Sequence, residues 1–187
     1  MRWRRGVGRL DPRRLVFVDE CGTHTSMMRP RARAPRGERA YGRVPRNRAK
    51  NTTLLASMGA EGMGACMAVV GSTKKAVFEA YVERVLAPSL RPGVVVVMDN
   101  LGAHKTKRVK ELIEARGCEL VFLPPYSPDF SPIEEAFSKI KALLRKVKAR
   151  ERGTLVEAIG RALSAITAQD ARGFFGHCGY PIVDQPS

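Results

Sequence analysis

The sequence predicts an α/β fold in which a mixed five-stranded sheet carries helices on both faces. Five short apolar runs alternate with stretches whose apolar residues return at helical spacing, in the order strand, two hairpin strands, helix, strand, helix, strand and two helices. The 187 residues, of which 44% are apolar, are also enough for a single domain (residues 1–187) with its own hydrophobic core.

Five apolar runs are predicted as strands, and they are residues 15–18, 52–58, 63–70, 94–98 and 119–123. The second and third are separated only by the turn 59–62, which is typical of a hairpin. The fourth run reads Val-Val-Val-Val-Met, and such a continuous β-branched run favours a central strand that is covered on both faces.

Four helices are predicted from apolar periodicity, and they are residues 74–86, 105–116, 133–148 and about 154–167. Pro88 is expected to end the first helix, because proline has no amide hydrogen for the helical ladder. Residues 173–187 contain two Phe, several Gly and Pro181, and the sequence leaves open whether they form a packing tail or a contact with a partner.

The chain is strongly basic, with 33 Lys+Arg against 18 Asp+Glu and a net charge of +15, so a polyanion is the expected partner. Residues 1–50 hold most of this excess. Among them, residues 29–50 interrupt arginines with three prolines and are predicted to form a basic arm or hairpin. A second basic run occupies residues 139–152, and for both runs a merely solvated face is the alternative.

Residues 1–14 are a basic extension with six arginines and no apolar segment of the kind that an export signal needs, so we expect a cytoplasmic protein. No apolar run is long enough to span a membrane. The four cysteines lie far apart in the sequence without zinc-ligand spacing, and they are predicted to be reduced, mostly buried thiols.

Two acids follow neighbouring strands of the predicted sheet. A right-handed crossover through the first helix would lay residues 94–98 beside residues 15–18 and parallel to them. Asp19 and Asp99 would then meet at the carboxyl edge of the sheet, where open α/β sheets bind their ligands. Either acid alone is more often a turn residue or a helix cap.

A third acid, Glu134, lies in a proline-rich connection that brings the start of the long helix back to the same edge. Ser131 and Glu134 also match a helix capping box, with Pro132 at the favoured first position. Three converging carboxylates repel one another unless a cation lies among them, and oxygen ligands select Mg²⁺ or Mn²⁺. With a polyanion as partner, the chemistry indicated is two-metal phosphoryl transfer on nucleic acid.

The acids lie in three blocks, which are Val18-Asp19-Glu20, residues 98–105 (MDNLGAHK) and residues 123–134 (LPPYSPDFSPIE). Over roughly residues 15–148 these blocks resemble the DDE transposases, and more narrowly the bacterial insertion-sequence branch of the mariner superfamily. The 34 residues between Asp99 and Glu134 match the spacing of that branch.

The resemblance implies an RNase H-like fold and the catalytic domain of a cut-and-paste DNA transposase. Such an enzyme cleaves the element's ends hydrolytically and then joins the freed 3′-hydroxyl to target DNA, in this branch usually at the dinucleotide TA. The family pattern assigns catalysis and the binding of two Mg²⁺ or Mn²⁺ ions to Asp19, Asp99 and Glu134. Two ends must be brought together, so a homodimer on DNA is expected.

Other residues of the three blocks are expected beside the site. Glu20, Asn100 and His104 would support it, Asn100 by orienting a water or a phosphate. His104 would either contact a phosphate or hydrogen-bond to its surroundings. Glu135 points about 100° away from Glu134 round the helix, and Asp129 is interpreted as a turn residue. DNA contacts are predicted for Arg31, Arg33, Arg36, Arg43, Arg46, Arg48, Lys50, Lys105, Lys141 and Arg145.

Complete members of the family carry a helix-turn-helix module ahead of the catalytic domain, whereas only about 14 residues precede the first predicted strand. Either the chain is a fragment, or a separate or upstream module recognises the transposon ends, or the copy is a decayed remnant. By itself the chain is expected to bind DNA nonspecifically at the bacterial nucleoid. Two alternatives are open: a structure-specific RNase H-like nuclease without strand transfer, and a non-catalytic DNA-binding remnant whose acids are caps and turns.

Overall fold

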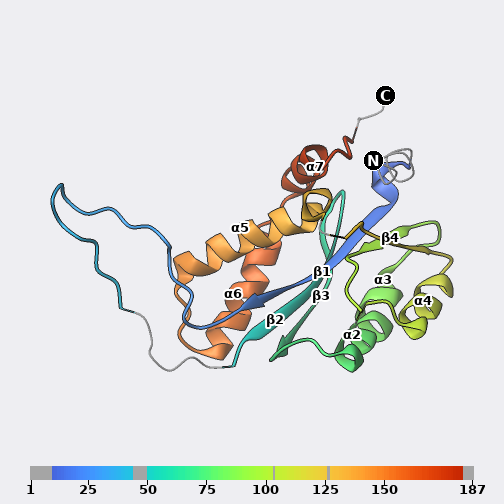
Figure 1. Ribbon diagram of the computed structural model, residues 1–187, viewed down its shortest axis with the longest axis horizontal. Coiled ribbons are helices and arrows are strands. Elements are labelled where there is room, and N and C mark those ends of the chain that lie inside the picture. The colour runs from blue at the N-terminus through green and yellow to red at the C-terminus, as the bar shows by residue number, and fades with distance from the viewer. Residues whose placement is uncertain (1–9, 44–49, 103, 126, 183–187) are drawn as a thin grey trace.

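The computed structural model describes residues 10–43, 50–102, 104–125 and 127–182 (Figure 1). Within them, five strands form one sheet, and they are β1 (Leu15–Thr23), β2 (Thr52–Gly59), β3 (Gly62–Val70), β4 (Val95–Met98) and β5 (Glu119–Phe122). Their order across the sheet is β3-β2-β1-β4-β5. Since β1 runs antiparallel to β2 and parallel to β4, the predicted mixed sheet is confirmed.

Helices cover both faces of this sheet, as predicted. They are η2 (Pro12–Arg14), α2 (Lys75–Tyr81), η3 (Val82–Leu86), α3 (Ala87–Ser89), α4 (Lys107–Glu114), η4 (Pro128–Phe130), α5 (Pro132–Val147), α6 (Arg152–Ser164) and α7 (Ala168–His177). Helices α5, α6 and α7 gather on one side of the sheet, and α2, α3 and α4 on the other (Figure 1). None of the helices in the described ranges is long and apolar enough to cross a membrane.

Alternation along β1 decides which of its residues face α5. Phe17 and Cys21 belong to the core beneath α5, α6 and α7, whereas Val18 belongs to the core formed with α2 and α4. Because successive side chains of a strand leave opposite faces, Asp19 lies on the α5 side. The four cysteines are free thiols, and three of them are buried, in agreement with the prediction.

The first strand is longer than predicted. Beyond Val18 it continues to Thr23, because these residues pair with β2, beginning with Asp19 opposite Ala56. An acid after an apolar run suggests a strand end in the sequence, but the neighbouring strand supplies backbone partners that carry β1 onward. Asp19 therefore lies inside a strand.

The first helical stretch also runs further than predicted, through residues 75–89. It passes from α2 into the π-helical segment η3 and then into α3, and Pro88 lies within α3. The π-helical segment interrupts the regular hydrogen-bond ladder, so Pro88 occupies the start of a new turn, where its missing amide hydrogen breaks no bond.

Helix α7 is not predicted by the sequence analysis. Thr167 caps it through a capping box with Asp170, and Ala171 and Phe175 are buried against the rest of the molecule. Two glycines weaken its helical pattern, so burial rather than propensity stabilises it. In residues 173–182 the side chains of Phe175, Cys178 and Tyr180 are buried, which favours packing for this part of the tail, and residues 183–187 lie outside the described residues.

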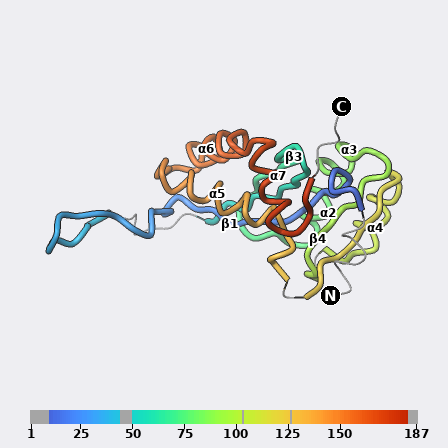
Figure 2. The backbone as a smooth tube through the Cα atoms, turned by 90° about the horizontal axis from the view of Figure 1, so that it is seen from above, coloured from blue at the N-terminus to red at the C-terminus, as the bar shows by residue number. Residues whose placement is uncertain are grey.

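The connection between β1 and β2 extends away from the body of the protein (Figures 1 and 2). At its tip the amide of Glu38 donates to the carbonyl of Pro35 at 3.0 Å, and Gly37 takes a φ of 89° in this turn. Residues 29–43 are all exposed, and no strand pairing links the described parts of the connection. Over residues 29–43 the connection therefore has the form of an exposed arm; the predicted contacts Arg46 and Arg48 lie outside the described residues.

Candidate active site

Asp19 is placed beside Asp99 by the parallel pairing of β1 and β4. The last pair of this ladder joins Val18 to Met98, so the two acids follow directly on adjacent strands. Asp19 is held by its own backbone, because the amide of Glu20 donates to Oδ1 of Asp19 at 2.7 Å. The register of β1 and β4 thus places the two acids side by side, as predicted. β1 continues beyond Asp19, whereas β4 ends before Asp99.

Asp99 is oriented by two donors. Nδ1–H of His104 donates to Oδ1 of Asp99, and the amide of Leu101 donates to the same oxygen at 3.1 Å. His104 is only 1% exposed and stacks on Phe78, with ring centroids 4.0 Å apart. Of the two roles predicted for His104, the structure favours the hydrogen bond to its surroundings over the contact with a phosphate.

The surroundings of Asp99 keep its carboxylate ionised. Burial alone would raise the pKa of Asp99, but the hydrogen bond and the charge of His104, together with the Leu101 amide, outweigh burial and lower it. A carboxylate that stays charged at neutral pH is an oxygen donor suited to a cation.

Glu134 lies in the first turn of α5 and is exposed. The predicted capping box is not formed, because the side chain of Ser131 makes no capping hydrogen bond. The turn is closed by backbone alone, with the amide of Glu134 donating to the carbonyl of Ser131 at 3.1 Å. Pro132 takes the predicted first helical position.

One cavity of about 470 Å³ is lined by all three carboxylates, those of Asp19, Asp99 and Glu134. The other described residues of its wall are Asn100, Leu101, Leu123, Pro124, Pro125, Ser127, Pro128 and Ser131. Three acids from a strand, a loop and a helix therefore share one cavity, although Asp19 and Glu134 are 115 positions apart in the sequence.

The pKa of Asp19 reflects the burial and the negative charge of this cavity. The pKa of Asp19 is raised to about 7, chiefly by burial and also by the charges of Glu134 and Asp99, against the opposing effects of the Glu20 amide and His104. An acid with such a pKa is about half protonated at neutral pH unless a positive charge is supplied. A cation in the cavity would restore its ionised form.

The donor set fits a hard divalent cation by its chemistry. Within the described ranges, no three Asp, Glu, His or Cys side chains already stand together as a metal cluster. Mg²⁺ nevertheless retains several waters and needs only one or two carboxylates directly, so a shared cavity is sufficient. Carboxylate oxygens are the donors that select Mg²⁺ or Mn²⁺ over softer metals.

The structure separates the remaining predicted neighbours of the site. Asn100 lines the cavity, but Glu20 does not. As the next residue along β1, Glu20 leaves the opposite face of the sheet, and its Oε2 is buried with no hydrogen-bond partner among the described residues. Asp129 lies in the 3-10 turn η4, as a turn residue should, and Glu135 bonds to His177 instead of lining the cavity.

The predicted DNA contacts fall into two groups. Arg31, Arg33, Arg36, Arg43 and Lys50 are exposed on the arm. The second group is Lys105, whose ammonium lies 5.6 Å from the ring centroid of Phe122, and Lys141 and Arg145, which are half-buried on α5.

The pKa of the Cys21 thiol is raised to about 12, chiefly by burial. The charge of Lys141 opposes this rise, whereas the charges of Asp19 and Glu134 contribute to it, so Lys141 and the two acids act on the same thiol.

The second basic run is not one solvated face. Lys139 forms an ion pair with Asp170 of α7 at 2.6 Å. Arg150 donates to the carbonyl of Thr25 at 3.0 Å, where the arm leaves β1. These two cations are therefore used to hold the fold, and sequence reasoning missed both partners because each lies far away along the chain.

A family model described as "DDE superfamily endonuclease" matches residues 14–156, which is most of the chain. Among curated proteins, no relative matches the sequence. The fold is similar to that of a pre-cleavage Mos1 transpososome, with a TM-score of 0.76 and 17% identity over 95% of this chain and 55% of that chain.

Two further solved structures share the fold. The Mos1 strand transfer complex has a TM-score of 0.71 and 18% identity, over 95% of this chain and 54% of that one. The mariner Mos1 paired end complex with Mg has a TM-score of 0.69 and 17% identity, over 97% of this chain and 57% of that chain. The chain thus spans about half the length of these proteins, and the predicted RNase H-like architecture is confirmed.

Proposed function

The chain belongs to the DDE superfamily endonucleases, and from this membership we propose that it is the catalytic domain of a cut-and-paste DNA transposase. One observation carries the proposal: Asp19, Asp99 and Glu134 come from separate elements and line one cavity. The fold shared with a pre-cleavage Mos1 transpososome and with the Mos1 strand transfer complex supports both steps of the reaction.

Each residue of the site has a definable task. Asp19, Asp99 and Glu134 would hold two Mg²⁺ or Mn²⁺ ions, which supply Lewis-acid stabilisation of the phosphoryl group and activation of a water or a 3′-hydroxyl. His104 keeps Asp99 ionised and fixed in orientation through Oδ1. Residues 123–125, 127, 128 and 131 of the connection between β5 and α5 form part of the cavity wall.

DNA would be bound through charge and without sequence readout. Arg29, Arg31 and Arg33 line a cavity of about 450 Å³ at the arm together with Tyr41 and Lys148. Guanidinium groups bind phosphate oxygens in a bidentate fashion, which suits this exposed surface to a DNA backbone. Lys141, Arg145 and Lys105 would contact the strand that enters the catalytic cavity.

The proposal extends to partners. We assign recognition of the transposon ends to a separate or upstream helix-turn-helix module, and synapsis of two ends to a homodimer on DNA, with target joining at TA. The element would be a bacterial insertion sequence of the mariner superfamily, so that the enzyme acts at the nucleoid. The paired-end arrangement of the similar Mos1 complex supports the dimer.

Nicking of supercoiled plasmid by the purified chain tests the catalytic assignment. With Mn²⁺ present we expect nicking by the wild type and a loss of at least about 100-fold in Asp99→Asn, because the substitution removes a donor charge of the cavity while keeping the side chain's size. Binding of DNA at low salt should be unchanged in the variant. Nicking that is independent of metal, or equal in both proteins, would overturn the proposal.

A joining assay separates a transposase from a nuclease that only hydrolyses. A labelled duplex with a free 3′-hydroxyl is incubated with the chain, Mn²⁺ and plasmid, and transfer of label to the plasmid is measured. A transposase joins the two, and a duplex with a 3′-dideoxy end is the matched control. Nicking without joining would identify the structure-specific nuclease instead.

A further inference from the structure

We propose that the C-terminal helix α7, together with Tyr180, is a positioning element of the active site that fixes Glu134 relative to Asp19. It lies beyond residues 14–156, the part of the chain that the family model matches. The inference rests on the proposed function in one respect, the role of the two acids in binding a divalent cation.

The start of α5 lacks the local interaction that would fix it. The side chain of Ser131 makes no capping hydrogen bond, although the sequence matches a capping box there. Unsatisfied first turns of helices fray unless other groups hold them. Glu134 lies in this first turn, so its position depends on contacts from elsewhere in the fold.

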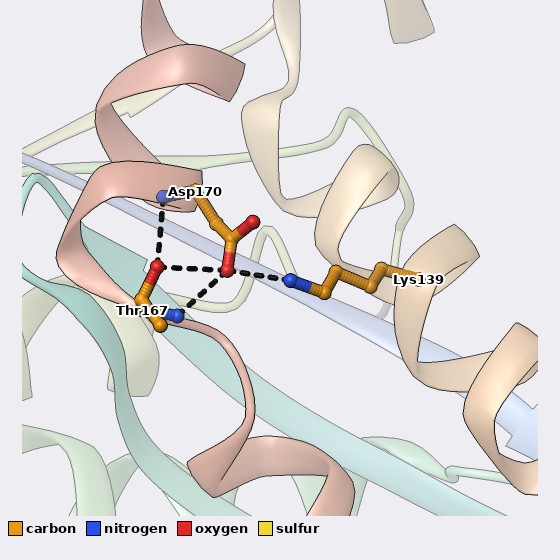
Figure 3. Close-up of polar contacts among 3 residues, drawn as sticks. All are labelled: Lys139, Thr167 and Asp170. Atoms are coloured by element: carbon orange, nitrogen blue, oxygen red, sulfur yellow. Dashed lines mark hydrogen bonds and ion pairs between the residues drawn. The ribbon is translucent and has the colours of Figure 1, made fainter.

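Helix α7 supplies those contacts along one side of α5. Lys139 donates from Nζ to Oδ2 of Asp170 at 2.6 Å, and the same carboxylate accepts from the amide and the hydroxyl of Thr167, each at 2.9 Å (Figure 3). Asp170 thus caps α7 and binds α5 at once. The ion pair is half-buried, which strengthens it relative to a pair on the open surface.

Nearer to Glu134, two more anchors flank the start of α5. Nδ1–H of His177 donates to Oε1 of Glu135, the residue that follows the catalytic acid. The hydroxyl of Tyr180 donates to the carbonyl of Phe130 at 3.0 Å, in the 3-10 turn η4 that leads into α5. The first turn of α5 and the 3-10 turn before it are therefore each bonded to the C-terminal segment.

The same segment also contacts the strand that carries Asp19. The ring of Phe17, two residues before Asp19 on the same face of β1, lies 5.4 Å from Phe175 and 5.3 Å from Tyr180 between centroids. All three side chains are buried. One rigid aromatic cluster therefore joins β1, α7 and, through the Tyr180 hydroxyl, the approach to Glu134.

The geometry predicts what loosening α7 does. A carboxylate on a mobile first turn would be a poorer ligand than one held in place, because preorganisation lowers the cost of ordering the donor on binding. The effect should fall on cation affinity more than on overall stability, since the hydrophobic contacts of α7 stay in place.

The test is a pair of mild substitutions that cut two of the three polar anchors, leave the bond between His177 and Glu135, and keep the packing. Lys139→Met removes the cation from α5 and leaves the Thr167–Asp170 capping box intact, and Tyr180→Phe removes only the hydroxyl. Glu61→Gln is the matched control, because it breaks the exposed ion pair between Glu61 and Arg172, which ties α7 to the β2–β3 turn and not to α5.

Mn²⁺ binding to the full chain is measured by electron paramagnetic resonance without DNA. The wild type and Glu61→Gln should bind alike, while the Lys139→Met/Tyr180→Phe double variant should show a dissociation constant raised roughly three- to tenfold. Tyr180→Phe alone should show a smaller rise in the same direction, and it carries the test by itself if the double variant does not fold.

Equal Mn²⁺ affinity in wild type, control and Tyr180→Phe would overturn the inference, because α7 would then serve stability alone. A different result marks failure of the proposed function: a wild type whose Mn²⁺ binding is absent, or is unaffected by Asp99→Asn, has no cation at these acids. The two failures are thus distinguished within one titration series.

Discussion

At the scale of the residue, His104 acts on the site through Asp99. It is buried, stacked on Phe78, and hydrogen-bonded to one oxygen of the acid, so the second oxygen of Asp99 is left for the cavity. His104 is therefore a positioning residue: it sets the ionisation and the orientation of the Asp99 carboxylate and is not itself a ligand.

We expect His104→Phe to keep a ring against Phe78 and to remove the donor. The pKa of Asp99 should then rise, because burial would be opposed only by the Leu101 amide. Mn²⁺ affinity should fall by roughly tenfold, which a metal titration measures. His104→Asn, which retains a donor, should recover part of the affinity. A His104→Phe protein that binds Mn²⁺ like the wild type would refute the positioning role.

At the scale of the element, two helices with similar sequence signals begin differently. Thr167 accepts from the amide of Asp170 at 3.1 Å and completes a capping box, whereas Ser131 makes no side-chain cap. Ser131 follows a proline-rich connection and lines the cavity, and its side chain makes no cap there.

Matched alanine substitutions measure this difference. Thr167→Ala should lower the free energy of unfolding by about 1 kcal/mol, the usual cost of losing an N-cap, whereas Ser131→Ala should change it by less than about 0.5 kcal/mol. Denaturation by urea gives both values. Equal losses in the two variants would show that Ser131 caps α5 in solution.

The contact between α5 and α7 should also be sensitive to acid. The hydrogen bond from Lys139, followed by those from Thr167, lowers the pKa of Asp170 to about 2. Because the folded-state pKa lies below the unfolded value, this stabilisation is fully present above about pH 4 and is lost as the pH falls toward 2.

The comparison of wild type with Asp170→Asn isolates this effect from other acids. The difference in melting temperature between the two proteins should be constant from pH 7 to about 5 and should shrink as the pH approaches 2. Circular dichroism melts at each pH measure it. A difference that does not change with pH would show that Asp170 is not ionised in the contact.

At the scale of the whole molecule, the basic charge is divided between two uses. The arm extends away from the body of the protein, and the arginines of residues 29–43 on it are exposed, whereas Lys139 and Arg150 each bond to another part of the fold (Figure 2). Of these two sets, only the arginines of the arm can attract a polyanion without giving up a contact that holds the fold together.

Neutralising two arginines of the arm should therefore affect DNA binding and not folding. In Arg31→Gln/Arg33→Gln, the slope of the logarithm of the binding constant against the logarithm of salt concentration should decrease in magnitude by about 2. Lys107→Gln/Lys110→Gln on α4, whose lysines pair with Glu111 and Glu114, is the control with the same change in charge. Equal slopes for the two double variants would exclude the arm as a specific DNA contact.

Local patterns in the sequence determined much of this protein. The order of strands and helices, the hairpin, the central valine strand and the positions of the three acids follow from apolar periodicity and from short motifs. Such patterns are set by the sterics of neighbouring residues, which is why they can be recognised without knowledge of the rest of the chain. The basic composition likewise indicated a polyanion as partner.

Only the tertiary structure decided how these parts meet. It extended β1 past Asp19, bonded His104 to Asp99, left Ser131 without a capping bond and formed α7. The anchors of α7 join residues that are 31 positions apart in Lys139–Asp170 and 50 apart in Tyr180–Phe130. Contacts at such separations leave no periodic signal, because they depend on packing of the whole chain and not on the preference of any one segment.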